Sequence, residues 1–214
     1  MRATILFLNL IFLAATAATS HATEQIPDEV IYERKTYDLI GVTGELPTPE
    51  TFGMETRATL SSNWRGFYTK YEIRLNKLEI YQITINAKDN EYRNINGIRP
   101  DFETDKECYG TGEDRFCTRY GALYNEVEYP VNLNGKLRLG HRLLPWFRVH
   151  MGFQKPSAYK EVIELEFVNG EIVDVIDRSE EVEIIRGEFK DYYDNSMNEE
   201  AIVEAFSLSM EELK

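Results

Sequence analysis

The stretch Gly66–Ile85, with the sequence GFYTKYEIRLNKLEIYQITI, decides the fold of this chain. From Gly66 to Leu75 the side chains alternate between a mainly apolar face and a mainly charged one. A period of two is typical of a half-buried strand. Asn76-Lys77 predicts a turn, after which Leu78–Ile85 returns as the second strand. We therefore expect a β-hairpin over these residues.

Three further turn signals surround this hairpin. Asp28–Leu39 predicts a strand, a turn and a strand. Asn134-Gly135 and Asn169-Gly170 each lie between apolar runs, and Asn-Gly is a strong hairpin signal because both turn positions need a positive φ. Each Asn-Gly pair is therefore predicted to join two antiparallel strands.

The strand before Asn169-Gly170 alternates apolar and acidic residues. Its apolar residues are predicted to face the core: Ile163, Leu165 and Phe167. The acids between them, Glu164 and Glu166, are predicted to face solvent. Replacing Glu164 by alanine is therefore expected to leave the stability almost unchanged.

The remaining segments complete a mainly β fold. Residues 86–126 are polar and weakly periodic, and are predicted to form long loops. Residues 196–213 are predicted to form one helix, because a capping-box pattern begins at Ser196 and an apolar stripe at helical spacing follows it. The expected architecture is a single antiparallel sandwich or curled sheet with one C-terminal α-helix.

The N-terminus predicts export. Met1 and Arg2 precede an apolar run over residues 4–18, and Ser20-His21-Ala22 places small residues at positions −3 and −1 of a cleavage site. Residues 1–22 are predicted to be a signal peptide, and residues 23–214 a single β-rich domain that is periplasmic or secreted. The apolar run is too short for a membrane anchor, so none is expected.

The two cysteines, Cys108 and Cys117, flank a short loop that contains two glycines. Because export places thiols in an oxidising compartment, a disulfide between them is predicted. A metal pair or a redox pair is the alternative, but the chain has neither C-x-x-C spacing nor a histidine nearby. No cofactor is expected. No metal site is expected either, because only His141 and His150 remain after cleavage.

The formal net charge is −13, and loss of Arg2 with the signal peptide makes the mature chain more negative still. No basic stretch offsets the acid, so repulsion argues against nucleic acid and anionic membranes as partners. A basic protein or a cationic ligand is the partner that this charge favours. The alternative is that the charge serves solubility alone.

The stretch Trp146–Gln154 alternates again and is predicted to form a strand. If its apolar face is buried, the opposite face carries an aromatic ring, a cation, an imidazole and an amide, which together suit a small anion or a carbohydrate ring. These candidate ligand-binding residues are Trp146, Arg148, His150 and Gln154. The alternative is a strand face that is exposed to solvent or covered by an interface.

Several stretches together resemble a family of uncharacterised bacterial proteins. The resemblance is carried by Asp28–Tyr37, by Trp64-Arg65-Gly66-Phe67, by Val149-His150-Met151-Gly152-Phe153 and by Glu164–Gly170. It covers most of residues 28–177, although Arg34 stands where the family usually has a glycine. The resemblance implies one β-rich domain. It implies no particular chemistry, because no activity is known for the family.

Signatures of catalysis are missing from the sequence. The chain has no G-x-S-x-G elbow and no glycine-rich phosphate loop, and its cysteines are expected to be bridged. The expected function is therefore a non-enzymatic protein-binding module, of an inhibitor or immunity type, for a basic partner. Two alternatives stay open: a small-ligand-binding protein that uses the Trp146–Gln154 face, and an envelope enzyme with an unrecognised carboxylate site.

Overall fold

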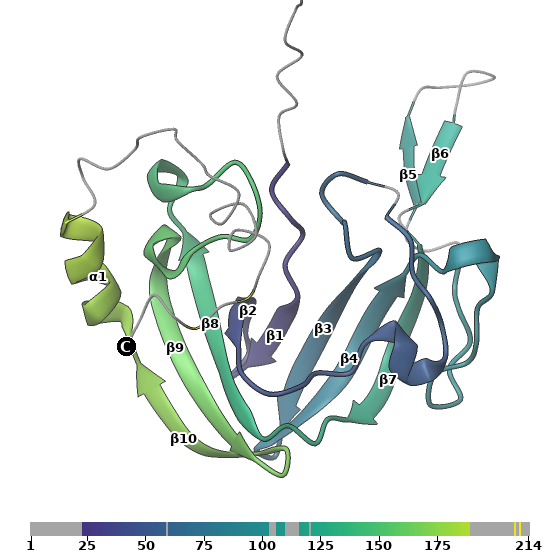
Figure 1. The fold of residues 1–214 in the computed structure, drawn as a ribbon. Helices are drawn as coiled ribbons and strands as arrows, with labels where there is room; N and C mark the ends of the chain where they lie inside the picture. The colour runs from purple at the N-terminus through teal and green to yellow at the C-terminus, as the bar shows by residue number, and fades with distance from the viewer. Residues whose placement is uncertain are drawn as a thin grey trace, which may run out of the picture.

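A computed structural model describes residues 23–58, 60–102, 106–109, 116–119, 121–188, 208 and 210 of the chain. Residues 1–22, predicted as a signal peptide, lie outside the described residues. One sheet of eight strands forms the body of the molecule, and a two-stranded hairpin projects from it (Figure 1).

The strands are β1 (Glu29–Tyr32), β2 (Lys35–Val42), β3 (Phe67–Arg74), β4 (Lys77–Ile85), β5 (Lys106–Tyr109), β6 (Phe116–Arg119), β7 (Ala122–Pro130), β8 (Gly135–Leu143), β9 (Tyr159–Val168) and β10 (Glu171–Asp177). The short 3-10 turns are η1 (Pro49–Phe52), η2 (Lys88–Asn90), η4 (Pro145–Phe147) and η5 (Pro156–Ala158). The α-helix of the described residues is α1 (Ser179–Glu188).

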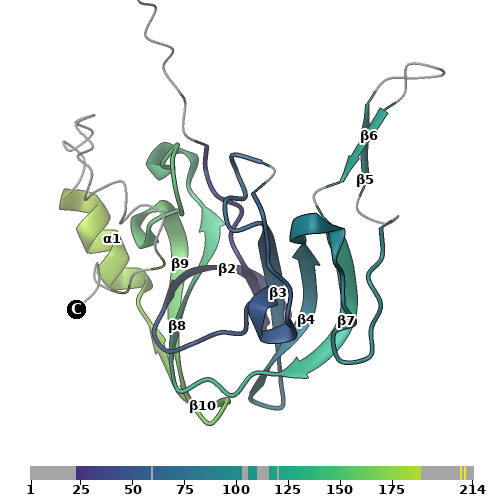
Figure 2. The same cartoon turned by 45° about the vertical axis from the view of Figure 1, so that its right-hand side comes forward.

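The strand order in the large sheet is β10-β9-β8-β2-β1-β3-β4-β7. All neighbouring strands are antiparallel except β1 and β3, which are parallel. The sheet is strongly curled, and its two halves face each other in both views (Figures 1 and 2). At one end the curl closes, because Glu171 of β10 pairs with Lys77 of β4. The mainly β class in the form of a curled sheet is thus confirmed.

Three of the predicted hairpins are present. β1 and β2 join at Glu33-Arg34, β3 and β4 at Leu75-Asn76, and β9 and β10 at Asn169-Gly170. Both residues of each turn have a positive φ, which gives the turn whose twist matches that of a hairpin. The β3–β4 turn falls one residue before the predicted Asn76-Lys77.

The hairpin predicted at Asn134-Gly135 is wrong. β7 ends before this pair and bonds to β4, whereas β8 begins at Gly135 and bonds to β2 and β9. A Cβ atom on Gly135 would lie 2.1 Å from the carbonyl oxygen of Thr43, so glycine is required by a close backbone approach. The Asn134 side chain accepts a hydrogen bond from the N–H of Asn169 at 2.8 Å. Asn134-Gly135 therefore lies in a connection between two strands, β7 and β8, that pair with different partners in the sheet, and not in a hairpin turn.

The main core lies on one face of the curled sheet, which we call the core face. Met54, Ala87 and Ile95, from segments between the strands, are buried in the same cluster. Its strand residues that are at most 1% exposed are Val30, Leu39, Tyr71, Leu78, Ile80, Ile83, Ile85, Ala122, Tyr124, Val127, Leu137, Leu139, Leu165 and Phe167. The opposite side of the sheet is called the outer face below.

Residues 86–126, predicted as long loops, contain more regular structure than expected. They include η2, the β5–β6 hairpin and the start of β7. In the β5–β6 hairpin the backbone of Cys108 lies directly opposite that of Cys117. The predicted disulfide between the two side chains lies outside the described residues.

Among the described residues, the α-helix near the C-terminus is α1, which begins at Ser179. Its Val182 packs on the outer face of the sheet against Ile40 and Val162. Within the predicted helix 196–213, residues 208 and 210 have no regular secondary structure, and the others lie outside the described residues. In the part of the chain that the structure describes, no helix combines the length and apolar character needed to cross a membrane.

Candidate functional site

The segment predicted as the ligand-binding strand, Trp146–Gln154, is not a strand. It begins inside η4 and continues through bends, and Gly152 has a φ of 75°. Pro145 starts the 3-10 turn, and the left-handed backbone at Gly152 breaks any extended conformation. The alternation of apolar residues therefore did not indicate a strand at this place.

The four candidate side chains of this segment do not share one face. Trp146 is 86% exposed and His150 is exposed, whereas Gln154 is buried. The Gln154 amide accepts a hydrogen bond from the N–H of Val149 at 2.9 Å and donates to its carbonyl oxygen at 2.8 Å. Gln154 thus closes the loop that contains His150.

Arg148 and Gln154 both contact the N-terminal segment. Arg148 forms an ion pair with Glu24, and the Gln154 amide donates to the other carboxylate oxygen of Glu24 at 2.8 Å. The N–H of Gln25 donates to the carbonyl oxygen of Gly152, also at 2.8 Å. These two candidates therefore have partners within the chain, and the strand face on which a ligand was expected is not formed.

A different stretch of the chain, over β10 and α1, has exposed charges of one sign only. β10 and α1 follow each other along one side of the molecule (Figure 1). Between residues 171 and 187, all of which the structure describes, every exposed charged side chain is a carboxylate: Glu171, Asp174, Asp177, Glu180 and Glu183. Aliphatic side chains with exposed fractions of 46% to 61% lie among them: Val173, Val175 and Ile184. We call this surface the acidic rim.

The two arginines of the same stretch are directed inward. Arg178 donates to Glu181 at 2.8 Å and to Glu164 at 3.3 Å. Arg186 donates to the carbonyl oxygens of Ser157 and Tyr159 at 3.0 and 2.6 Å, which fastens α1 to the start of β9. Neither arginine is therefore among the exposed charges of this stretch, which are all negative.

A buried ion pair underlies this arrangement. Arg138 of β8 and Glu164 of β9 are paired across the two strands, and their side chains are only 1% and 4% exposed. The second carboxylate oxygen of Glu164 accepts the bond from Arg178. The hydrogen bond to Glu181 raises the pKa of Arg178, which keeps this guanidinium charged. Glu164 therefore draws Arg178 toward the sheet and away from the rim.

The rim keeps its negative charge at its centre, where β10 passes into α1. Hydrogen bonds from the side chain and the backbone of Ser179 lower the pKa of Asp177. At the far end Glu171 forms an ion pair with Lys77 at 3.1 Å, with both side chains more than half exposed. This pair cancels most of the charge of Glu171 at a distance, so the negative potential of the rim comes from Asp174, Asp177, Glu180 and Glu183.

The free edge of β10 is poorly suited to accept an added strand. The pairing of β10 with β9 is irregular between Ile172 and Asp174, and the side chain of Asp174 accepts the N–H of Val175 at 2.9 Å. Bulges and charged residues are the devices that blunt an edge strand. The rim therefore offers side chains, and not a strand edge, to a partner.

Sequence reasoning missed the acidic rim as a site. Residues 171–183 contain six acidic residues and one arginine, which is a visible local excess of charge. What the sequence does not display is the inward direction of Arg178, because its partner Glu164 was predicted to face solvent. Among the described residues, no group of three or more histidine, cysteine, aspartate or glutamate side chains is arranged to hold a metal ion.

Comparison with models of known protein families, with curated proteins and with solved structures finds no match for this chain. The resemblance to a family of uncharacterised bacterial proteins therefore stays a prediction.

Proposed function

We propose that this chain is a non-enzymatic protein-binding module whose acidic rim binds a basic partner protein. One observation carries the proposal: the exposed charges of the rim are all carboxylates, while Arg178 and Arg186 bond to acceptors of the chain itself. A surface with one sign of charge favours partners of the opposite sign and disfavours the rest.

Two physical effects act together at such a surface. The carboxylates attract a basic protein over about one Debye length, roughly 8 Å at physiological salt, and so speed the encounter. The exposed side chains of Val173, Val175 and Ile184 supply apolar area that leaves water on contact. Charge thus selects the partner, and apolar contact prolongs the complex.

The place of action follows from the predicted signal peptide. The predicted signal peptide, residues 1–22, directs the mature chain to the periplasm or to the outside of the cell. In either place the predicted Cys108–Cys117 disulfide is stable. A binding module of an inhibitor or immunity type works there by covering a basic surface of its target. No cofactor has a part in this function.

The two alternatives have less support. The small-ligand alternative depended on a strand face at Trp146–Gln154, and the structure forms no such face. The enzyme alternative needs two carboxylates that converge. The buried carboxylates among the described residues, Asp28 and Glu164, each bond instead to an arginine, and the half-buried Asp38 bonds to the Tyr159 hydroxyl.

Site-specific photo-crosslinking in the cells that export the protein tests the proposal. A photo-reactive residue in place of Ile184 is expected to crosslink a protein of high isoelectric point. The same residue in place of Asn94, which is exposed on the segment after η2, is the control and is expected to give no such product. Capture of the same protein from both positions, or of an acidic protein at Ile184, would count against the rim as the binding surface.

A further inference from the structure

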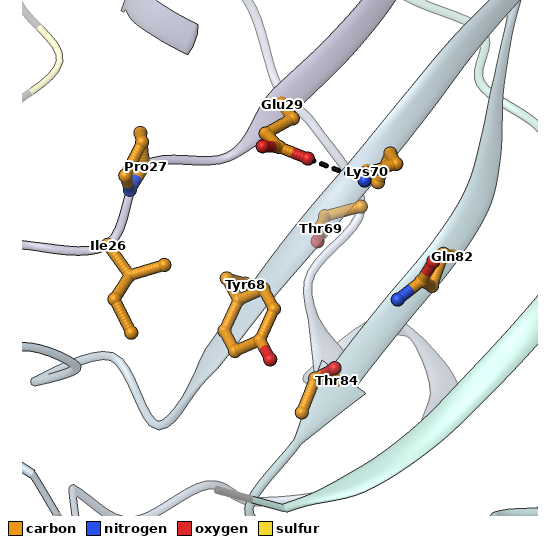
Figure 3. Close-up of a pocket in the computed structure, with 8 residues that line it drawn as sticks. All are labelled: Ile26, Pro27, Glu29, Tyr68, Thr69, Lys70, Gln82 and Thr84. Atoms are coloured by element: carbon orange, nitrogen blue, oxygen red, sulfur yellow. Dashed lines mark ion pairs between the residues drawn. The ribbon is translucent and has the colours of Figure 1, made fainter. Parts of the chain in front are cut away.

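A small pocket on the outer face of the sheet has no part in the proposed function. Its volume is about 130 Å³, and Figure 3 shows its walls. It is lined by the N-terminal segment and by strands β1, β3 and β4: Ile26, Pro27, Glu29, Tyr68, Thr69, Lys70, Gln82 and Thr84.

Strand register builds the polar side of this pocket. Lys70 of β3 lies between Glu29 of β1 and Gln82 of β4, so that these residues form one row across three strands. In the next row along β3, Tyr68 lies opposite Thr84. Cross-strand neighbours on one face have their side chains close together, which gathers these groups without any loop.

Thr84 is the most informative of these residues. It is 0% exposed, and its hydroxyl has no hydrogen-bond partner among the described residues. A buried hydroxyl without a partner costs free energy, so a bound group that supplies the missing bond is favoured. In Figure 3 the Tyr68 ring, the Thr84 hydroxyl and the Gln82 amide surround the same space.

The charges of the pocket cancel. Glu29 and Lys70 form an ion pair at 2.7 Å, with side chains 37% and 32% exposed. An anion would meet Glu29 and the net negative charge of the whole chain, and a cation would meet Lys70. A neutral group that both donates and accepts hydrogen bonds can bond to each partner without separating the pair.

The remaining walls are apolar. Ile26 and Pro27 close one side of the pocket, and Tyr68 contributes an aromatic ring that is partly buried. Such surfaces bind the C–H face of a ring. Sites for drug-sized ligands have volumes of about 300–1,000 Å³, so this smaller pocket suits a single small ring.

We infer that this pocket binds one neutral, polyhydroxylated ring, that is, a single uncharged sugar residue. The ring lies against Tyr68, its hydroxyls bond to the Glu29–Lys70 pair and to the Gln82 amide, and one hydroxyl bonds to Thr84. The pocket is formed by other residues than the acidic rim, so the inference stands or falls independently of the proposed function.

Amide-resolved NMR of the full mature chain tests the inference. The probes are the methyl glycosides of glucose, galactose and N-acetylglucosamine, with glucuronate as the charged comparison. At least one neutral glycoside is expected to give saturable shifts at the amides of residues 68–70 and 82–84. Thr84→Val removes the hydroxyl and keeps the branched shape, and is expected to weaken that binding about tenfold or more.

Thr36→Val, at an exposed threonine of β2, is the matched control and is expected to leave the affinity unchanged. Since the Thr84 hydroxyl has no partner to lose, Thr84→Val is expected to fold, with unchanged amide shifts far from the pocket. If it does not fold, Gln82→Ala takes its place with the same expected loss. The inference is overturned by no saturable shift with any neutral glycoside, by tighter binding of glucuronate, or by equal affinities of the pocket and control variants.

Discussion

The guanidinium of Arg138 lies against the carboxylate of Glu164 in the interior, with Nε and Nη2 at 2.8 and 2.5 Å from the same oxygen. The two residues are in register on β8 and β9. The prediction that Glu164 faces solvent is therefore wrong. Glu164 does lie on the face opposite Leu165, as the alternation required. That face is covered, because α1 packs on β9 and the carbonyl oxygen of Met210 reaches Arg138 at 3.3 Å.

Replacing Glu164 by glutamine is expected to destabilise the protein strongly. The change leaves the Arg138 charge buried without its counter-ion, and breaking one side of a buried ion pair costs about 3–5 kcal/mol. Urea denaturation of the variant and the wild type measures the loss. Glu166→Gln on the same strand is the control, because Glu166 is 41% exposed and its ion pair with Lys136 contributes little. Equal losses in the two variants would contradict the account of the buried pair.

Replacing Asp38 by asparagine is expected to change how stability depends on pH. Burial raises the pKa of Asp38, although the Tyr159 hydroxyl, which donates to it at 2.7 Å, opposes the shift. A carboxyl with a raised pKa binds its proton more tightly in the folded state. The free energy of unfolding of the wild type therefore falls as the pH rises from about 3.9, the ordinary pKa of an aspartate, through the higher pKa of Asp38 in the folded protein.

Asparagine keeps an oxygen for the Tyr159 hydroxyl and carries no charge. Asp38→Asn is therefore expected to gain stability relative to the wild type between pH 3 and pH 7, as followed by urea denaturation at each pH. Asp89→Asn, on the exposed turn η2, controls for the loss of one carboxylate. A relative stability of Asp38→Asn that stays constant across this range would show that burial does not control this carboxyl.

Cys108 and Cys117 are expected to form a disulfide in the exported protein. They are register partners in the β5–β6 hairpin. Directly opposed residues have Cα atoms about 4.5–5.5 Å apart, which is within the range that a disulfide spans. Thiol labelling under denaturing, non-reducing conditions should find no free thiol, and reduction should cost roughly 2–3 kcal/mol of stability. Two labelled cysteines in the exported protein would refute the prediction.

Local signals predicted the hairpins well, because a two-residue turn and the alternation beside it are fixed by neighbouring residues. Asn169-Gly170 and the burial of Leu165 are examples. Asn134-Gly135 failed because its glycine is required by Thr43, a residue distant in the sequence. The burial of Glu164 depends likewise on what covers the second face of β9. The acidic rim was missed for the same reason, since its charge is unbalanced only while Arg178 points inward.

The central claim is that the carboxylates of the acidic rim attract a basic partner. The rim variant Asp174→Asn/Glu180→Gln/Glu183→Gln and the control variant Glu50→Gln/Glu91→Gln/Glu126→Gln remove the same formal charge. All six side chains are exposed, and the control residues lie on η1, after η2 and on β7. A difference between the variants therefore reports on the position of the charge and not on its amount.

The most direct measurement is the association rate constant of the partner crosslinked at Ile184 with the wild type and both variants, at about 50 and 500 mM salt. The rate for the wild type and the control variant is expected to fall as salt rises, because screening removes the attraction. The rim variant is expected to associate about tenfold more slowly at low salt and to depend less on salt. Equal rates for the rim and control variants at low salt would contradict the account.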